Sequence, residues 1–138
     1  MSINTGNFNN YLEVAREAAI RAGVVLKERF RKLCPSMIDE KAKNDFVTEA
    51  DKKSEEIIKG HIRSQFNNHD ILAEESLAVR NASPFLWIID PLDGTLNYIH
   101  GLPCFAVSIA LEIEGELAVG FIYEPLRENI YSAIKGQG

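Results

Sequence analysis

Two carboxylates lie close together in the segment WIIDPLDGT, residues 87–95. Asp90 follows a continuous apolar run, and Asp93 comes after a Pro-Leu pair within the same tight turn. Carboxylates this close repel each other, and a buried pair is costly unless it is neutralised. A divalent cation neutralises them most directly, and all-oxygen ligands favour Mg²⁺, Mn²⁺ or Ca²⁺ over zinc. The carbonyl of Leu92, which lies between the two aspartates, could add a neutral oxygen ligand.

Gly94 and Thr95 follow the aspartates, and the sequence predicts a helix or helical turn that begins here. The free N–H groups and the positive dipole end of a helix start suit a phosphate. Metal and anion would then lie side by side, as phosphoryl transfer requires. A simpler interpretation is a bare turn, in which aspartate caps the backbone and glycine takes positive φ. That interpretation accounts less well for a turn that follows an apolar strand and carries Thr95, Asn97 and His100.

The motif of another phosphatase class is similar to residues 90–95. Haloacid-dehalogenase-like phosphatases place Asp-x-Asp-Gly-Thr after an apolar strand and use the first aspartate as nucleophile. Here the spacing from Asp90 to Asp93 is one residue longer, which would misdirect the second carboxylate. That motif also usually lies near the start of its domain, whereas two predicted helices precede Asp90. We therefore favour the metal and phosphate turn.

Two helices are expected to position this turn. Apolar residues at helical spacing predict the first helix over Phe8–Leu33. The second helix begins at Thr48, where Thr48-Glu-Ala-Asp51 is a variant of the capping box, and it ends at Asn67-Asn-His69. Between the helices, Asp39–Phe46 is polar and without periodicity, which indicates a loop or a short irregular hairpin.

A run of strands follows the helices in the sequence. The predicted strands cover Ile71–Ala73, Phe85–Ile89, Phe105–Ile113, Leu117–Tyr123 and Ile130–Ile134. The third of them has bulky residues on one face and small residues on the other, which suits the packing of helices on it. This order predicts an α+β fold, with two long N-terminal helices packed on a largely antiparallel sheet.

The composition narrows the class of protein. A chain of 138 residues is long enough for one domain with a real core. The net charge of −5 argues against nucleic acid as a main partner, but it allows a phosphorylated small molecule, because a bound cation can reverse the local sign of a site. The sequence has neither a signal peptide nor an apolar run of membrane-spanning length, so we expect a cytoplasmic protein without a membrane partner. Cys34 and Cys104 lack metal or disulfide spacing and are expected to be reduced and packed as small apolar residues.

Three motifs resemble the N-terminal part of the inositol monophosphatase family, bacterial type. They are NDFVTEAD at residues 44–51, EES at 74–76 and WIIDPLDGTLNYIHG at 87–101, in this order and spacing, and PCFAVSIAL at 103–111 also matches. The resemblance covers nearly the whole chain. It implies the first half of the layered αβαβα sugar-phosphatase fold, a homodimer, and a Mg²⁺-dependent, lithium-sensitive phosphatase.

The resemblance also implies roles for individual residues. Glu74, Asp90 and the Leu92 carbonyl would hold one Mg²⁺, and Asp90 and Asp93 would share a second. Glu74 and Thr95 would orient and deprotonate the attacking water, and the backbone of Gly94 and Thr95 would bind phosphate oxygens. The implied substrate-binding set is Glu74, Leu92, Asp93, Gly94 and Thr95.

The resemblance places two further segments near the metals. Asp51 would approach them through water and polarise the hydroxyl of Thr95, and either Lys41 or Lys43 would help to place a more weakly held metal. Simpler interpretations stay open at this point. Asp51 could serve only as a helix-cap partner, Glu74 could belong to a solvated acidic loop, and His100 is more typical of a surface histidine than of a general acid.

Members of the family are considerably longer, with a second αβ half that contributes another metal ligand and most contacts to the alcohol part of the substrate. We therefore expect residues 1–138 to form an N-terminal metal- and phosphate-binding domain, with the C-terminal αβ half absent from this chain. Inositol phosphate, fructose 1,6-bisphosphate, nucleotide 3′-phosphates and NADP cannot be separated as substrates.

Two functions from different classes follow from these observations. The first is a Mg²⁺-dependent phosphomonoesterase that hydrolyses inositol monophosphate or a similar sugar phosphate by attack of a metal-activated water. The second is a non-catalytic metal-binding or regulatory partner protein. The intact set of Glu74, Asp90, Asp93 and Thr95 favours the first, because a purely structural module has no physical need for that cluster.

Overall fold

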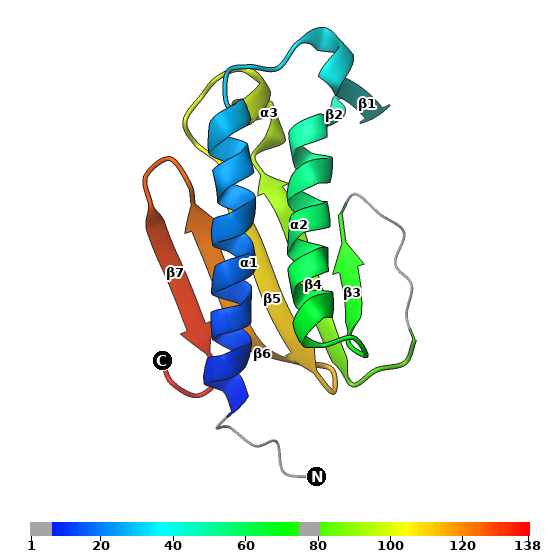
Figure 1. Ribbon diagram of the computed structural model, residues 1–138, viewed down its shortest axis with the longest axis vertical. Coiled ribbons are helices and arrows are strands. Elements are labelled where there is room, and N and C mark those ends of the chain that lie inside the picture. Colours follow the sequence, from blue (N-terminus) through cyan, green and yellow to red (C-terminus); the bar gives the residue numbers. More distant parts are fainter. Residues whose placement is uncertain (1–6, 75–80) are drawn as a thin grey trace.

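Two long helices lie side by side across one face of a sheet in the computed structural model, which describes residues 7–74 and 81–138 (Figure 1). The helices are α1 (Phe8–Arg29), η2 (Pro35–Met37, a 3₁₀ turn), α2 (Glu49–Gln65) and α3 (Thr95–Ile99). The strands are β1 (Ile38–Ala42), β2 (Asp45–Thr48), β3 (Asp70–Ala73), β4 (Phe85–Asp93), β5 (Ala106–Ile113), β6 (Glu116–Glu124) and β7 (Asn129–Ile134).

The main sheet has five strands in the order β3-β4-β5-β6-β7. β3 pairs with β4 in parallel, and the other three pairings are antiparallel. The predicted α+β class and the largely antiparallel sheet are therefore confirmed. β1 and β2 form a separate antiparallel hairpin with a register shift between Glu40 and Ala42, which corresponds to the irregular hairpin that the sequence allows at this place.

The core lies between the two helices and the face of the sheet that they cover. α1 contributes a row of fully buried small residues, Ala15, Ala18, Ala19 and Ala22. At Gly23, an added Cβ would lie 2.5 Å from Cε1 of Tyr123 on β6, so the ring of Tyr123 packs directly against α1 at this glycine. From the sheet, the bulky side chains of Val107, Ile109 and Leu111 fill the same space. The bulky face of β5 thus packs against the helices.

Several boundaries differ from the predicted ones. α1 ends at Arg29 instead of Leu33, because Arg31 adopts a left-handed φ of 63° and its guanidinium donates two hydrogen bonds to the Gly101 carbonyl, at 3.2 and 3.0 Å. β4 continues to Asp93 instead of ending at Ile89. The additional residues pair with β5 after an irregularity, which shapes the site described below.

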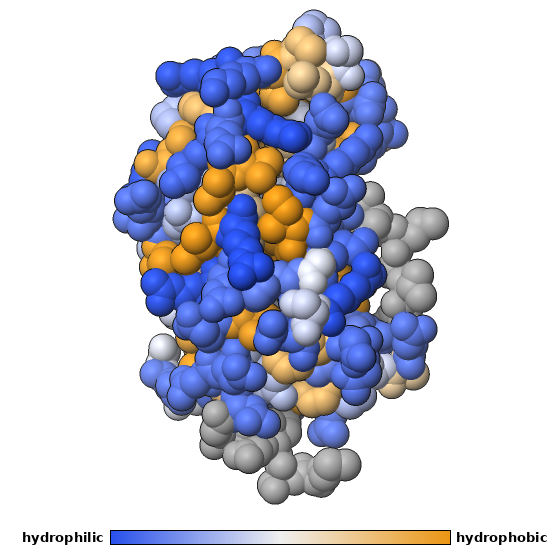
Figure 2. All heavy atoms as spheres, in the orientation of Figure 1, coloured by the Kyte–Doolittle hydropathy of each residue, from blue (hydrophilic) through white to orange (hydrophobic). Residues whose placement is uncertain are grey.

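The surface over the helices is mainly hydrophilic, with apolar atoms gathered over the C-terminal half of α1 (Figure 2). Val24 is an exposed apolar residue in that part of the helix. None of the helices within residues 7–74 and 81–138 is long and apolar enough to span a membrane. Cys34 and Cys104 are free as expected, but both are exposed instead of packed in the core.

Candidate metal and phosphate site

Three of the predicted site segments meet at one end of the sheet (Figure 1). β3 ends immediately before Glu74, and its parallel partner β4 carries Asp90. The register pairs Ala73 with Ile89, and the backbone N–H of Glu74 donates to the Ile89 carbonyl at 3.3 Å. Parallel pairing therefore brings Glu74 beside Asp90 although the two residues are well separated in sequence.

A bulge in β4 holds the two aspartates. Asp90 pairs with Ser108 of β5, and the ladder resumes at Asp93 opposite Ala106, so β4 has one more residue than its partner over this stretch. Pro91 has no N–H to contribute to a ladder, which favours an interruption here. A bulge re-aims the side chains next to it, so the predicted turn is a bulged end of the strand.

Asp90 interacts with both of the other carboxylates. Burial, a side-chain hydrogen bond with Glu74, and the negative charges of Glu74 and Asp93 together raise the pKa of Asp90 to about 7. The Leu92 N–H donates to Oδ1 of Asp90 at 3.3 Å and opposes this rise. Asp90 is thus close enough to both Glu74 and Asp93 for their charges to affect its protonation.

The carboxylates of Glu74, Asp90 and Asp93 have the donor atoms of a magnesium site but not yet its geometry. Within residues 7–74 and 81–138, no three acidic, histidine or cysteine side chains converge closely enough to hold a metal ion as they stand. The chemistry of the donors nevertheless fits Mg²⁺, because Glu74, Asp90 and Asp93 supply only oxygen atoms. Glu74 and Asp93 are exposed, so both side chains have room to turn toward an ion beside Asp90.

Gly94 connects the bulge to α3 in a conformation that excludes other residues. Its φ is 93°, and an added Cβ would lie 2.9 Å from the carbonyl oxygen of Cys104. The short helix that follows is fixed to α1 by Tyr98, whose buried hydroxyl donates to the Leu26 carbonyl at 2.8 Å. The first N–H groups of a helix have no partner within it, so these groups of α3 are available to an anion. With only five residues, α3 adds little dipole.

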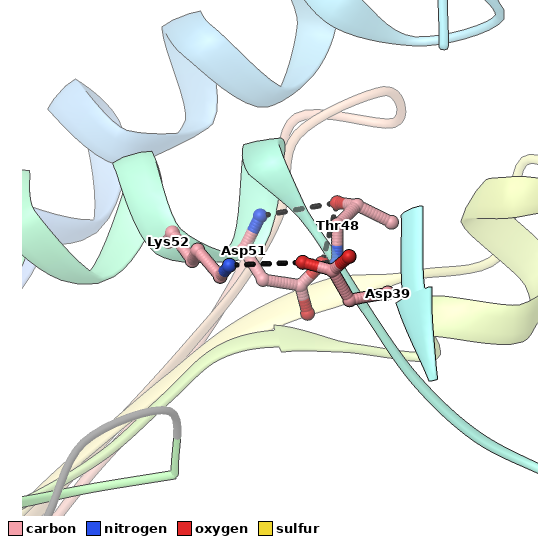
Figure 3. A network of polar contacts seen from close by, with 4 residues as sticks. All are labelled: Asp39, Thr48, Asp51 and Lys52. Carbon is pink, nitrogen blue, oxygen red and sulfur yellow. Dashed lines mark hydrogen bonds and ion pairs between the residues drawn. The ribbon is translucent and has the colours of Figure 1, made fainter. Parts of the chain in front are cut away.

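Asp51 is fully buried and uses both of its carboxylate oxygens. Oδ2 accepts from the backbone N–H of Thr48 at 2.9 Å and from its hydroxyl at 2.5 Å. The backbone N–H of Asp51 donates in turn to Oγ1 of Thr48 at 3.2 Å, which completes the capping box of α2 (Figure 3). Oδ1 accepts from the hydroxyl of Thr95 at 3.0 Å. Burial raises the pKa of Asp51, and the hydrogen bonds from Thr48 and Thr95 oppose the rise. Asp51 is thus a helix cap and, at the same time, the partner of Thr95.

The Thr95 hydroxyl also lies 3.1 Å from the carbonyl oxygen of Leu92. A hydroxyl carries one hydrogen, so Thr95 shares it between Leu92 and Asp51. This shared bond joins the helix cap to the bulge. Leu92 itself is buried, and its backbone is the part that reaches the site.

The two candidate lysines, Lys41 and Lys43, both belong to the β1–β2 hairpin. Lys41 is on β1, with Nζ 3.8 Å from Asp45, and Lys43 is in the turn. Next to the cap, Lys52 of α2 pairs with Asp39 of β1 at 3.1 Å, which ties the hairpin to the helix (Figure 3). His100 is exposed at the end of α3, as the simpler interpretation expects. Glu75 and Ser76 of the second motif lie outside the described residues.

Ser54 is a site residue that the sequence did not single out. It is fully buried on α2, one turn after Asp51, and its hydroxyl donates to the Pro91 carbonyl at 2.7 Å. This bond holds the middle of the bulge against the helix. A small polar residue in a stripe of buried apolar ones is the only indication in the sequence, and it does not say which carbonyl the hydroxyl meets.

Comparisons with known proteins point to one family. The profile of the Inositol monophosphatase family matches residues 8–138. The chain is 47% identical over 132 residues to the fructose-1,6-bisphosphatase/inositol-1-monophosphatase of Aquifex aeolicus (strain VF5), covering 96% of this chain and 50% of that protein. It is 41% identical over 131 residues to Nus factor SuhB of Pasteurella multocida (strain Pm70), covering 94% and 49%.

Solved structures give the same result for the fold. The inositol monophosphatase from Anabaena superposes with a TM-score of 0.80 at 41% identity, over 96% of this chain and 46% of that one. The chain thus spans about half the length of the relatives it matches. The family profile extends over almost all of the chain, and the neighbouring structures have the same fold over that part. The chain therefore belongs to the inositol monophosphatase family.

Proposed function

We propose that this chain carries the metal and phosphate site of a Mg²⁺-dependent phosphomonoesterase that hydrolyses inositol monophosphate or a similar sugar phosphate. The observation that supports this most is the meeting of Glu74, Asp90 and Asp93 beside the Gly94–Thr95 turn. Carboxylates next to unpaired N–H groups suit a divalent cation and a phosphate at neighbouring positions. Family membership supports the same chemistry.

In this proposal, Glu74, Asp90 and the Leu92 carbonyl would hold one Mg²⁺, and Asp90 and Asp93 would share a second. The ions would neutralise charge and lower the pKa of bound water. The backbone N–H groups of Gly94 and Thr95 bind the phosphate oxygens. The residues contribute positioning and negative charge, which are the main protein contributions to phosphoryl transfer.

Proton transfer falls to Glu74 and Thr95. The Thr95 hydroxyl, held by Asp51, orients a water in line with the ester bond, and Glu74 accepts a proton from that water as its oxygen bonds to phosphorus. The bond between phosphorus and the ester oxygen breaks, the leaving alkoxide takes a proton from a solvent water, and Glu74 returns its proton to the solvent, so that inorganic phosphate and the free alcohol are formed. Either Lys41 or Lys43, in the β1–β2 hairpin, would help to place a further, weakly held ion.

Several wider properties belong to this proposal. The chain spans about half of its relatives, so we propose that residues 1–138 act as the N-terminal α+β domain of the site and that a C-terminal αβ half completes it. The name of the Aquifex aeolicus relative includes two sugar-phosphate activities, which supports this substrate class. We also propose a cytoplasmic homodimer that lithium inhibits and that does not bind nucleic acid.

A second function has support of its own. A relative with 41% identity is named Nus factor SuhB, and that name supports a regulatory partner protein that works without catalysis. The two functions differ in what they require of the site. Hydrolysis requires Asp93 and Thr95 for their chemistry, whereas a regulatory partner requires only that the fold is intact.

Phosphate release from inositol 1-phosphate with Mg²⁺, with and without Li⁺, tests the proposal. The assay uses this chain alone and a version extended by the second half of the Aquifex aeolicus relative. We expect activity in the extended version, inhibition by Li⁺ and loss of activity in Asp93→Asn, while Glu114→Gln, at a distant turn, keeps it. Full activity of Asp93→Asn would disprove the metal assignment, and equal activity of the short chain would disprove the role of the second half.

A further inference from the structure

Asp51 and Ser54 lie on the same face of α2, because residues three positions apart on a helix are neighbours. α2 lies over β4 (Figure 1), and both side chains are fully buried. Asp51 reaches the bulge of β4 through Thr95, whose hydroxyl also bonds to the Leu92 carbonyl. Ser54 reaches it directly, by its bond of 2.7 Å to the Pro91 carbonyl. Helix α2 therefore holds two successive peptide groups of the bulge.

The peptide group between Pro91 and Leu92 connects Ser54 to Asp90. Within residues 7–74 and 81–138 every peptide bond is trans, so the carbonyl and the N–H of this group point in opposite directions in one rigid plane. Its carbonyl accepts from Ser54, and its N–H, which belongs to Leu92, donates to Oδ1 of Asp90 at 3.3 Å. A buried hydroxyl on the helix is thus linked to a carboxylate of the candidate site through a single planar group.

The bond from Leu92 to Asp90 depends on the orientation of this plane. A distance of 3.3 Å is at the long end for an N–H donor, so a small rotation of the peptide would break the bond. The hydrogen bond from Ser54 to the carbonyl opposes such a rotation, and it polarises the peptide so that the N–H becomes a better donor. Pro91 is fully buried, so the peptide is shielded from water that could replace the serine hydroxyl.

We propose that Ser54 is a positioning residue of the candidate metal site, which orients the carboxylate of Asp90 through the Pro91–Leu92 peptide. Its hydroxyl fixes the peptide, and the peptide N–H then keeps Asp90 turned toward Glu74 and Asp93, whose charges it feels. Partners that hold a metal ligand in its direction raise the affinity for the ion. The inference rests on the proposed function, because it takes Asp90 as a ligand of the ion.

A serine with a purely structural role would leave the folded site unchanged. Loss of its hydroxyl would then lower the stability of the chain, but the folded molecules would bind a cation as before. A positioning serine predicts two changes within the folded protein. The Leu92 amide loses its hydrogen bond to Asp90, and the divalent cation binds more weakly.

Four variants of the 138-residue chain separate these roles. Ser54→Ala removes the hydroxyl, and Ser54→Thr and Ser54→Val form a matched pair of nearly equal shape in which only threonine keeps it. The matched pair serves as the test if Ser54→Ala does not fold. Ile62→Val is the control for lost stability, because Ile62 is fully buried on α2, about two turns beyond Ser54 and away from the bulge.

The first measurement follows the Leu92 amide by nitrogen-15 NMR of the metal-free chain. We expect this amide to shift upfield and to exchange its hydrogen faster in Ser54→Ala and Ser54→Val. Ser54→Thr and Ile62→Val should leave its chemical shift as in the unchanged chain. The reference is the amide of Glu114, which donates to the Pro84 carbonyl at 2.8 Å at the opposite end of the sheet and should not shift in any variant.

The second measurement is a titration with Mn²⁺ at a temperature where circular dichroism shows every variant to be folded. We expect Ser54→Ala and Ser54→Val to bind the ion about three- to tenfold more weakly than the unchanged chain, below the roughly 10–100-fold effect of direct partners of metal ligands. The effect is smaller because a peptide group separates Ser54 from Asp90. Ser54→Thr and Ile62→Val should bind the ion as the unchanged chain does.

The outcomes distinguish this inference from the proposed function. An unshifted Leu92 amide in Ser54→Ala and Ser54→Val, or equal Mn²⁺ affinity of Ser54→Val and Ser54→Thr, would overturn the role of Ser54 and leave the proposed function standing. Equally weakened binding by Ile62→Val would overturn it as well, because lost stability would then explain the effect. No saturable binding in any of the chains would overturn the proposed function and, with it, the action of Ser54 on a metal ligand.

Discussion

Ser54 connects α2 to the bulge that carries the aspartates. Its hydroxyl and the Pro91 carbonyl that it reaches are shielded from water. We expect Ser54→Ala to lower the free energy of unfolding by about 1–3 kcal/mol, because a buried acceptor loses its donor. Urea denaturation measures the effect.

The control for Ser54 is Ser64→Ala on the same helix. Ser64 is exposed and donates to the His61 carbonyl of its own helix at 2.6 Å, so water can replace its bond. Its removal should cost clearly less. An equal loss in the two variants would show that the contact between α2 and the bulge adds nothing to stability.

His69 makes the stability dependent on pH. Its ring is stacked between Phe66 and Phe85, with centroids at 4.5 and 4.3 Å, and Nδ1 accepts from the Trp87 indole at 3.0 Å. Burial lowers the pKa of His69, and the charge of Asp70 opposes this shift. A protonated ring could not accept the Trp87 bond.

The direction of the effect follows from this pKa. The folded protein favours neutral His69, so its contribution is complete above about pH 6.5 and is lost as the pH falls through the lowered folded value. We expect the free energy of unfolding to decrease between about pH 7 and pH 5, with Trp87, the only tryptophan, as the fluorescent probe of urea unfolding.

His69→Gln separates this effect from that of other groups. Glutamine can still accept the Trp87 bond but does not titrate, so this variant should show a flatter pH profile. His61, whose pKa burial also lowers, stays in both proteins and cancels in the comparison. Parallel profiles for the two proteins would rule out His69 as the source.

From the sequence, the position of a single residue in the site can be predicted only where a motif determines it. The spacing of Asp90, Asp93 and Gly94 indicates their proximity because they lie in one turn. The contact of Asp51 with Thr95 spans 44 positions, and only the resemblance to a family suggests it. Nothing in the sequence indicates the bond from Ser54 to Pro91, because it depends on how a helix is rotated over a strand end.

At the scale of elements, the join between β4 and α3 depends on Gly94. An alanine there would have both a positive φ and a Cβ 2.9 Å from the Cys104 carbonyl. We expect Gly94→Ala to lower the free energy of unfolding by more than about 2 kcal/mol, since strain of this kind alone costs about 1–3 kcal/mol. Thermal or urea unfolding measures the loss.

Gly115 provides a matched control in the β5–β6 turn. Its φ is 83°, but an added Cβ would meet nothing within 4 Å. Gly115→Ala therefore has the backbone strain without the clash and should cost less than Gly94→Ala. If Gly115→Ala were the more damaging change, the close approach to Cys104 would not be the reason for glycine at position 94.

The elements that the sequence predicts best are those with a strong local pattern. The capping box fixes the start of α2 at Thr48, and alternation fixes the strands of the antiparallel sheet. α1 ends before the predicted Leu33, because Arg31 turns away to reach Gly101. β4 continues past the predicted Ile89, because Asp93 pairs with Ala106 beyond Pro91, and a proline usually indicates the end of a strand.

At the scale of the whole molecule, the sequence predicts one helix layer on one sheet, and the structure agrees. The side of β5 that the helices cover could not be decided from the alternation alone, because both faces of that strand suit packing. α1 and α2 lie on the bulky face because they gain more buried apolar area there.

The central claim is that the carboxylates beside Gly94 and Thr95 hold a divalent cation. Titration of this chain with Mn²⁺, followed by the electron paramagnetic resonance of the free ion, tests it most directly, because Mn²⁺ accepts the same oxygen ligands as Mg²⁺. We expect saturable binding that Mg²⁺ displaces, at least about tenfold weaker in Asp93→Asn and unchanged in Glu114→Gln. Equal binding by Asp93→Asn and the unchanged chain, or no saturable binding at all, would contradict the account.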